Sequence, residues 1–191
     1  MSRLTKDDII TGAGRRFATY GYHGTSMRDL GDDLGILGSS IYAHVGGKQE
    51  LLVAVIERGA EGFDASAEAA LADGDGPIDT LRRLIAGHID VILDRRSEAR
   101  TYLSETSFLE QTEHERVLAM RRGYERTFVE VIQQGIDDGA FSSARAARLE
   151  AIYVLSILNG IDRWFDDAGP MDRGALVDDV SGFVLEGLGA G

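Results

Sequence analysis

Apolar residues recur at the three- and four-residue spacing of an α-helix along almost the whole chain, and only two of its 191 residues are proline. This spacing, together with the scarcity of proline, predicts an all-α protein rather than a β-sandwich or barrel. Cysteine is absent, which excludes disulfides, zinc–thiolate sites and thiol nucleophiles. The sequence contains neither the apolar core of a signal peptide nor an apolar run of about 18 residues that would span a membrane. We therefore expect a cytoplasmic protein that is not bound to a membrane.

The formal net charge of -12 is concentrated outside the first 50 residues. Residues 1–50 carry six basic and six acidic side chains, so the whole acidic surplus belongs to residues 51–191. Phosphate binding depends on local contacts, and charges beyond about 10 Å are screened at physiological salt. The overall acidity therefore does not exclude DNA binding by the amino-terminal part.

The first helix is predicted by an apolar stripe near the amino terminus. Ile9, Ala13 and Phe17 recur every four residues, Tyr20 continues the stripe, and Gly21 ends it. This pattern indicates an amphipathic helix of about four turns.

Two shorter helices are predicted to follow. Ser26 with Asp29 three residues later matches a capping box, and this second helix ends at Gly35. A third helix is expected over Gly38–His44, with Ile41 facing inward. Two short helices joined by a glycine-bearing turn are typical of a helix-turn-helix.

The remaining sequence predicts a helical second part. A connecting helix begins near Lys48, the DGDGP segment at residues 73–77 indicates a loop, and further helices are expected near residues 77–95, 99–109, 113–138, 144–166 and 172–188. Residues 149–165 are apolar almost all round, which is typical of a helix buried from several sides. The last helix has a single apolar stripe, formed by Leu176, Val180, Phe183, Val184 and Leu188. These two helices predict a homodimeric four-helix contact, and a central helix within a monomer is the alternative.

The amino-terminal pattern resembles the DNA-binding domain of the TetR/AcrR family of bacterial repressors. The resemblance spans Ile9–Val55 and is carried by Phe17-x-x-x-Gly21, Thr25-Ser26-Met27-Arg28-Asp29-Leu30, Gly35-Ile36, Ile41-Tyr42-x-His44 and Lys48-x-x-Leu51-Leu52. It implies an all-α homodimer with a helix-turn-helix DNA-binding domain at 1–50 and an effector-binding and dimerisation domain at 51–191. The implied partners are a double-stranded DNA operator and a small-molecule effector.

The resemblance also implies which residues contact DNA. Ser39, Ser40, Tyr42 and His44 would face the groove, while Arg28 and Lys48 would bind phosphates. The full expected DNA-binding set is Ser26, Met27, Arg28, Gly38, Ser39, Ser40, Tyr42, His44 and Lys48. Gly38 offers no side chain to the bases, so part of the specificity is expected to be indirect. Gly46 and Gly47 depart from the family pattern and are expected to make the exit of the reading helix less rigid.

The effector is expected to contact apolar side chains and a few polar anchors in the second part of the chain: Tyr102, Glu105, Phe108, Met120, Arg121, Tyr124, Phe128, Asn159, Arg163 and Trp164. Taken singly, most of these residue types are more often plain core. The Ile132-x-x-Gly135-Ile136-x-x-Gly139-x-Phe141 stretch is similar to the acyl-CoA-responsive subgroup of the family. Arginines between positions 95 and 126 would suit an anionic head group, or else form a solvated face paired with neighbouring acids.

Other functional classes fit the sequence less well. Gly12-Ala13-Gly14 begins like a dinucleotide fingerprint, but Phe17 stands where the third glycine belongs and no strand precedes it. The four histidines do not form a metal-ligand pair at helical spacing. We therefore expect no enzyme activity, no catalytic residues, no cofactor and no metal site. A helical protein-interaction adaptor without sequence-specific DNA binding is the remaining alternative.

Overall fold

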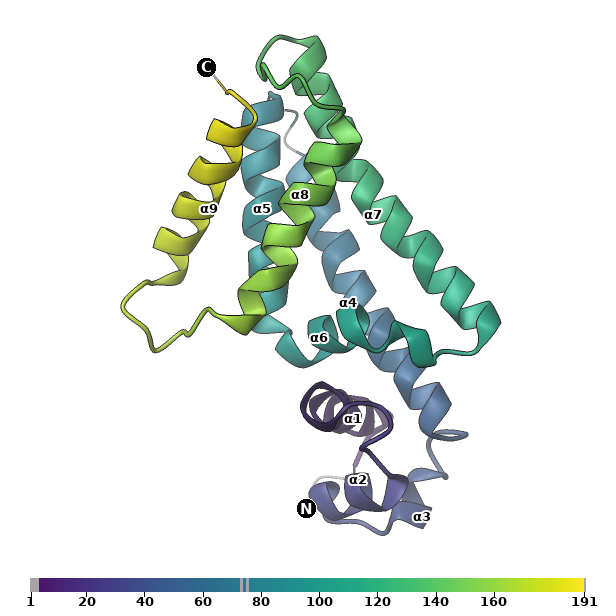
Figure 1. The fold of residues 1–191 in the computed structure, drawn as a ribbon. Coiled ribbons are helices and arrows are strands. Elements are labelled where there is room, and N and C mark those ends of the chain that lie inside the picture. Colours follow the sequence, from purple (N-terminus) through teal and green to yellow (C-terminus); the bar gives the residue numbers. More distant parts are fainter. Residues whose placement is uncertain (1–3, 73, 75, 191) are drawn as a thin grey trace. The chain divides into compact units, whose positions relative to one another are not determined.

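The computed structural model describes residues 4–72, 74 and 76–190 of the chain. Within these residues the secondary structure is helical, and the only extended pairing is an isolated bridge between Phe141 and Ala190 (Figure 1). None of the helices in this part of the chain has the length and apolar character needed to cross a membrane. The all-α prediction is confirmed.

The helices follow one another with short connections. In chain order they are α1 (Lys6–Tyr20), α2 (Met27–Leu34), α3 (Gly38–Ile41), α4 (Lys48–Leu71), α5 (Pro77–Asp94), α6 (Arg96–Ser104), the 3₁₀ turn η1 (Thr106–Phe108), α7 (Gln111–Asp137), α8 (Ala147–Gly160), the 3₁₀ turn η2 (Ile161–Arg163) and α9 (Arg173–Gly187). The expected loop at residues 73–77 lies partly outside the described residues.

The chain divides into two compact units. The amino-terminal unit contains the residues up to Glu61 together with Arg95–Ala119, and the carboxy-terminal unit contains Gly62–Asp94 and the residues from Met120 onward. The amino-terminal unit is therefore discontinuous in sequence, because α6 and the first part of α7 belong to it. The functional division at residue 50 expected from the sequence stays a prediction.

Local signals in the sequence account for the start of α1 and of α2. In α1, the Thr5 hydroxyl accepts from the Asp8 amide at 3.2 Å, and the Asp8 carboxylate accepts from the Thr5 amide at 2.8 Å. Ser26 and Asp29 form the same reciprocal capping box on α2. The stripe predicted for α1 is buried at Ile9, Ala13 and Phe17, but Tyr20 is 60% exposed and the prediction that it extends the stripe is wrong.

The helix-turn-helix depends on two glycines that allow backbone to contact backbone. A Cβ atom placed on Gly31 would lie 2.6 Å from the Gly38 nitrogen and 2.8 Å from the Ile36 carbonyl oxygen. A Cβ atom on Gly38 would lie 2.9 Å from the Met27 carbonyl oxygen. Because these neighbours are main-chain atoms, no side-chain rearrangement would relieve the clash.

The third helix is shorter than predicted. It ends at Ile41 rather than continuing to His44, because the amide of His44 donates to the Ile41 carbonyl at 2.9 Å and the chain tightens into a turn. The exit from this turn is held in place, since the Gly46 amide donates to the Glu50 carboxylate at 2.6 Å. This hydrogen bond restrains the glycine pair that was expected to loosen the exit.

The carboxy-terminal unit is built around α5. Figure 1 shows α5 beside both α8 and α9, and α5 packs against each of them. Most of the predicted α9 stripe is buried, but Phe183 is 66% exposed and does not belong to it. Helix α8 ends at Gly160 rather than near residue 166, because glycine is a poor helix former and the chain continues as the tighter η2 turn.

Replacing Gly31 by alanine should destabilise the protein by about 1–3 kcal/mol, the usual cost of forcing extra atoms into a packed site. The same substitution at Gly123, where the added Cβ would have no neighbour within 4 Å, should instead stabilise α7 by about 0.5–1 kcal/mol. Urea unfolding at one fixed protein concentration measures both changes. Equal effects of the two substitutions would contradict the proposed backbone contact.

Candidate DNA-binding surface and buried polar cluster

The segment expected to read DNA is available to solvent. Ser39 and Ser40 are exposed on α3, Tyr42 is 56% exposed in the following turn, and His44 is half-buried. Ile41, between them, is fully buried and anchors the segment to the core. The structure therefore brings these four polar side chains together on one short segment.

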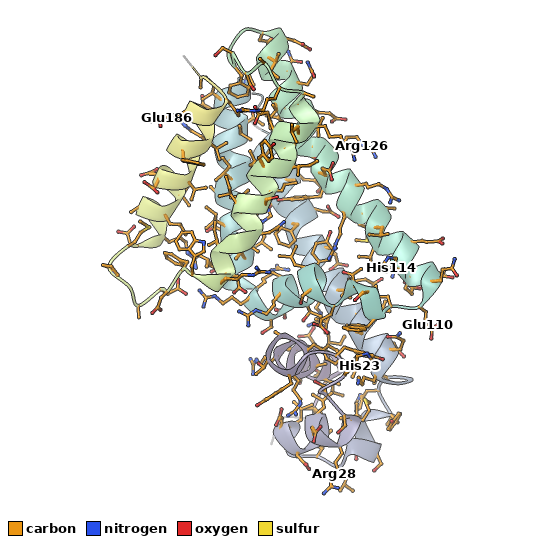
Figure 2. All side chains as sticks on the ribbon, viewed as in Figure 1. His23, Arg28, Glu110, His114, Arg126 and Glu186 are labelled. Atoms are coloured by element: carbon orange, nitrogen blue, oxygen red, sulfur yellow. The ribbon has the colours of Figure 1, made fainter. Side chains whose placement is uncertain are left out.

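Helix α2 supplies a cation and its own amino terminus. Arg28 is exposed and extends away from the ribbon in Figure 2. Ser26 is exposed but occupied by its cap, since its hydroxyl donates to the Asp29 carboxylate at 2.7 Å and accepts from the Asp29 amide at 3.1 Å. The pKa of Asp29 is lowered by the Ser26 hydroxyl and by the Ser26 amide, which donates to the same carboxylate at 3.0 Å. Met27 is half-buried, so Arg28 is the residue of α2 best placed to meet a phosphate.

The ammonium group of Lys48 lies over an aromatic ring. Its Nζ atom is 4.1 Å from the centroid of the Tyr22 ring, a cation–π distance. Burial lowers the pKa of Lys48.

Tyr22 is in turn held by the α6–η1 segment. Its ring stacks on Phe108 with centroids 5.8 Å apart, and its amide donates to the Glu105 carboxylate at 2.7 Å. The Gln49 side chain donates to the Phe108 carbonyl at 2.7 Å, and the His23 ring meets Phe108 edge-on. We call these contacts the aromatic clamp. It joins the α1–α2 connection and the start of α4 to residues 105–108.

Two of the residues expected to contact an effector, Glu105 and Phe108, belong to the clamp. Tyr102, Glu105 and Phe108 all lie in the amino-terminal unit, and Tyr102 is buried there. Glu105 and Phe108 are engaged with Tyr22 and its neighbours. A role in effector binding stays a prediction for them, and their contacts hold Tyr22 and Gln49 in place.

Several arginines are paired with acids. Arg16 of α1 contacts Asp33 at 2.7 Å and Asp29 at 3.7 Å. Arg116 lies 2.5 Å from Glu57 and 2.6 Å from a second acid, Glu113. By contrast, Arg122 and Arg126 are exposed on α7, and Arg126 extends outward in Figure 2. These two remain candidates for contacting an anion.

A buried polar cluster occupies the core of the carboxy-terminal unit. Tyr124 and Phe128 of α7, both expected at the effector site, pack around His88 of α5 together with Phe63 of α4. The Nδ1 atom of His88 is 3.0 Å from the Tyr124 hydroxyl. Of the other expected residues, Met120, Arg121 and Asn159 are half-buried, while Arg163 and Trp164 are exposed.

His88 is neutral in this core. Burial lowers its pKa to about 3, although the nearby Asn159 amide acts in the opposite direction. His88 falls in one stripe at helical spacing with Leu81, Leu84, Ile85 and Ile92, and the sequence alone assigns it no role. Its position at a core-facing step of that stripe was the available signal, but a partner from α7 can be seen only in the folded chain.

Within the described part of the chain, no three side chains of histidine, aspartate or glutamate gather as they would around a metal ion.

Comparison with known proteins agrees with this geometry. Residues 9–55 match the family model for bacterial regulatory proteins of the tetR family, and residues 74–188 match the model for tetracyclin repressor-like C-terminal domains. The chain belongs to the TetR family. The match to the first model covers α1, α2, α3 and the start of α4, the elements that form the candidate DNA-binding surface.

Several relatives of this TetR-family protein align over nearly its full length. The HTH-type transcriptional repressor KstR2 of Mycolicibacterium smegmatis is 22% identical, with 96% of this chain and 90% of the relative aligned. The solved structure of the regulator PfmR from Thermus thermophilus has a TM-score of 0.84 at 29% identity, covering 94% of this chain and 98% of that one. AibR, solved in complex with isovaleryl coenzyme A and operator DNA, has a TM-score of 0.85 at 22% identity, covering 93% and 96%. At that identity the likeness to AibR shows the fold alone.

Alanine at Tyr42 or at His44 should weaken binding to genomic DNA fragments that the protein retains, by about tenfold or more, without unfolding it. The equally exposed Tyr20 on α1 provides a matched control, and Tyr20→Ala should leave the affinity unchanged. Fluorescence anisotropy measures the affinity and circular dichroism the melting temperature. Normal binding by both variants would remove the assignment of the reading segment.

Acidification should reveal the neutral state of buried His88. Below its ordinary pKa of 6.5 the unfolded chain takes up a proton at this residue, whereas the folded chain does not until about pH 3. The contribution of His88 to stability is therefore complete above pH 6.5 and is lost as the pH falls. Between pH 7 and pH 5 the wild type should lose about 2 kcal/mol more than a His88→Gln variant. Urea unfolding at the two pH values tests this, and equal losses would contradict it.

Proposed function

We propose that this TetR-family protein is a ligand-responsive transcriptional repressor that binds a palindromic operator as a homodimer. The observation that carries the proposal is the exposed reading segment on a helix-turn-helix, set by the Gly31–Gly38 contact and flanked by Arg28. Such a segment enters a major groove, and two copies would read half-sites about 34 to 36 Å apart. This role would place the protein in the cytoplasm and requires no catalytic residue or cofactor.

The homodimer is supported by apolar side chains left exposed on the last two helices. Tyr153 of α8 is 48% exposed and Phe183 of α9 is 66% exposed, and Leu149 and Ile152 of α8 are exposed as well. Trp164, which directly follows η2, is also exposed. Water-exposed apolar residues gathered on two helices are typical of an interface. The sequence pattern predicted a helix buried from several sides, and a second copy of the chain would provide the missing cover over α8 and α9.

We propose an amphiphilic effector of the acyl-coenzyme A or fatty-acid class. The fold neighbour AibR was solved with isovaleryl coenzyme A and operator DNA. In this chain, the aromatic core of the carboxy-terminal unit would suit an acyl group, and the exposed Arg122 and Arg126 would suit phosphates. The effector would act by favouring dimers whose reading segments are spaced wrongly for the operator.

The proposal is tested by incubating the purified protein with sheared DNA of the source genome and sequencing what it retains. A recurrent inverted repeat is the expected result. The captured repeat then serves for titration with palmitoyl-coenzyme A and with a steroid-like coenzyme A ester, and release of the DNA at tens of micromolar is expected. Failure to enrich any sequence at low salt would favour the adaptor alternative, and failure to release would remove this effector class.

Glutamate at Tyr153 and at Phe183 should separate the dimer, because each substitution places a charge among the apolar side chains of α8 and α9. Leu71→Glu, on an apolar residue that is 47% exposed at the end of α4, is the control and should leave the dimer intact. Sedimentation velocity measures the mass, and anisotropy on the captured repeat measures DNA binding. If the Tyr153→Glu, Phe183→Glu double variant remained dimeric, the interface would lie elsewhere.

A further inference from the structure

Leu37, in the turn between α2 and α3, is an apolar side chain that the fold leaves in water. It is 74% exposed, more than any other large apolar residue in the described part of the chain. A single exposed leucine is common on protein surfaces and carries no meaning by itself. The position of Leu37 within the helix-turn-helix gives its exposure a meaning.

Leu37 occupies the N-cap of α3, a position that normally holds a side-chain oxygen. Thr5 and Ser26 hold the same position on α1 and α2, and the side chain of each accepts a hydrogen bond from a helix amide. Leu37 makes no such bond, so α3 begins without a side-chain cap. The chain therefore forgoes a stabilising hydrogen bond at this point and exposes an apolar side chain instead. Departures of this kind from a local preference are expected at functional positions.

Backbone contacts place Leu37 at the amino end of the reading segment. Its carbonyl accepts from the Ser40 amide at 2.8 Å. The next residue, Gly38, has no side chain, and a Cβ atom built on it would lie 3.0 Å from the Cα atom of Arg28, whose side chain extends away from the ribbon in Figure 2. Leu37 is therefore the first side chain of the reading segment, next to the point where α3 meets the start of α2.

A leucine at this place can recognise only an apolar group on DNA. The amino-terminal residues of a reading helix contact base edges in the major groove. Among the groups that base pairs present there, the C5 methyl of thymine is the apolar one, and the others are hydrogen-bond donors and acceptors. A phosphate would lose hydration against an alkyl side chain without gaining a hydrogen bond. The major groove thus offers one partner whose chemistry matches Leu37.

We propose that Leu37 is a specificity-determining residue that packs against the C5 methyl group of one thymine in each half-site of the operator. The inference rests on the proposed function, because it requires the reading segment to enter the major groove. It adds direct readout to a segment in which Gly38 offers no side chain to the bases. The contact favours a T·A over a C·G pair at that position and, unlike a contact from Arg28, releases no counterion.

The test replaces the thymines of the captured repeat one at a time by deoxyuridine, which removes the C5 methyl and leaves the hydrogen-bonding groups unchanged. Each replacement is made at the equivalent position of both half-sites. Fluorescence anisotropy measures the affinity of the full-length protein for each duplex. At one thymine the replacement should weaken binding by about fourfold for each half-site, the value of one buried methyl group.

Three variants of Leu37 separate a contact with thymine from a structural role. Leu37→Ala should weaken binding to the thymine duplex and make the thymine and deoxyuridine duplexes bind equally. Leu37→Ser restores a cap, so its melting temperature by circular dichroism should rise while the methyl preference is lost. Leu37→Met keeps an apolar side chain of similar volume and should keep the preference. Leu71→Ala, which truncates an exposed leucine of the other unit, is the control and should bind as the wild type does.

Two results on a captured repeat would overturn the inference. They are the absence of any thymine whose replacement weakens binding, and a methyl preference that survives in both Leu37→Ala and Leu37→Ser. In either case the regulator stands and the role of Leu37 fails. If no genomic DNA is captured, the proposed function fails and the inference fails with it.

Discussion

The candidate DNA-binding surface depends on the close approach of α2 and α3 at Gly31 and Gly38. Neither glycine can carry a side chain there, because main-chain atoms already occupy the space. The approach fixes where α3 begins and so where Ser39, Ser40 and Tyr42 point. The two backbones can meet closely only where both residues lack a Cβ atom, and this sets the position of the exposed segment.

The aromatic clamp extends this arrangement beyond the first fifty residues. Phe108, Glu105 and Gln49 hold Tyr22, and the Tyr22 ring carries the Lys48 ammonium. A cation expected to bind phosphate is therefore linked, through one ring, to a segment that follows α6. Any shift of that segment that moved the Tyr22 ring would change the surroundings of Lys48. The chain thus couples two parts of its amino-terminal unit that lie far apart in sequence.

Structural features that depend on residues close together in the chain could be predicted from the sequence. Features that depend on packing between helices could not. The capping box at Ser26 and the buried stripe of α1 follow from fixed spacings, and the structure confirms both. Tyr20 and Phe183 also fit a helical stripe, yet each lies at its edge, where only the neighbouring helix decides burial. The early end of α3 reflects competition between helix and turn hydrogen bonds over a few residues. The contact between His88 and Tyr124 joins α5 to α7, and no spacing within one helix encodes it.

The discontinuity of the amino-terminal unit has a consequence for modular exchange. The segment Arg95–Ala119 belongs with residues up to Glu61, although a whole helix, α5, separates them in the chain. A recombination event that joined residues 1–50 to the carboxy-terminal part of another protein would remove residues 105–108. Tyr22 and Gln49 would then lose their partners in the aromatic clamp. Exchange of the amino-terminal unit as a working module would require both of its segments to be transferred together. Amino-acid substitutions within residues 95–119 would then be constrained by operator recognition as well as by packing within the unit.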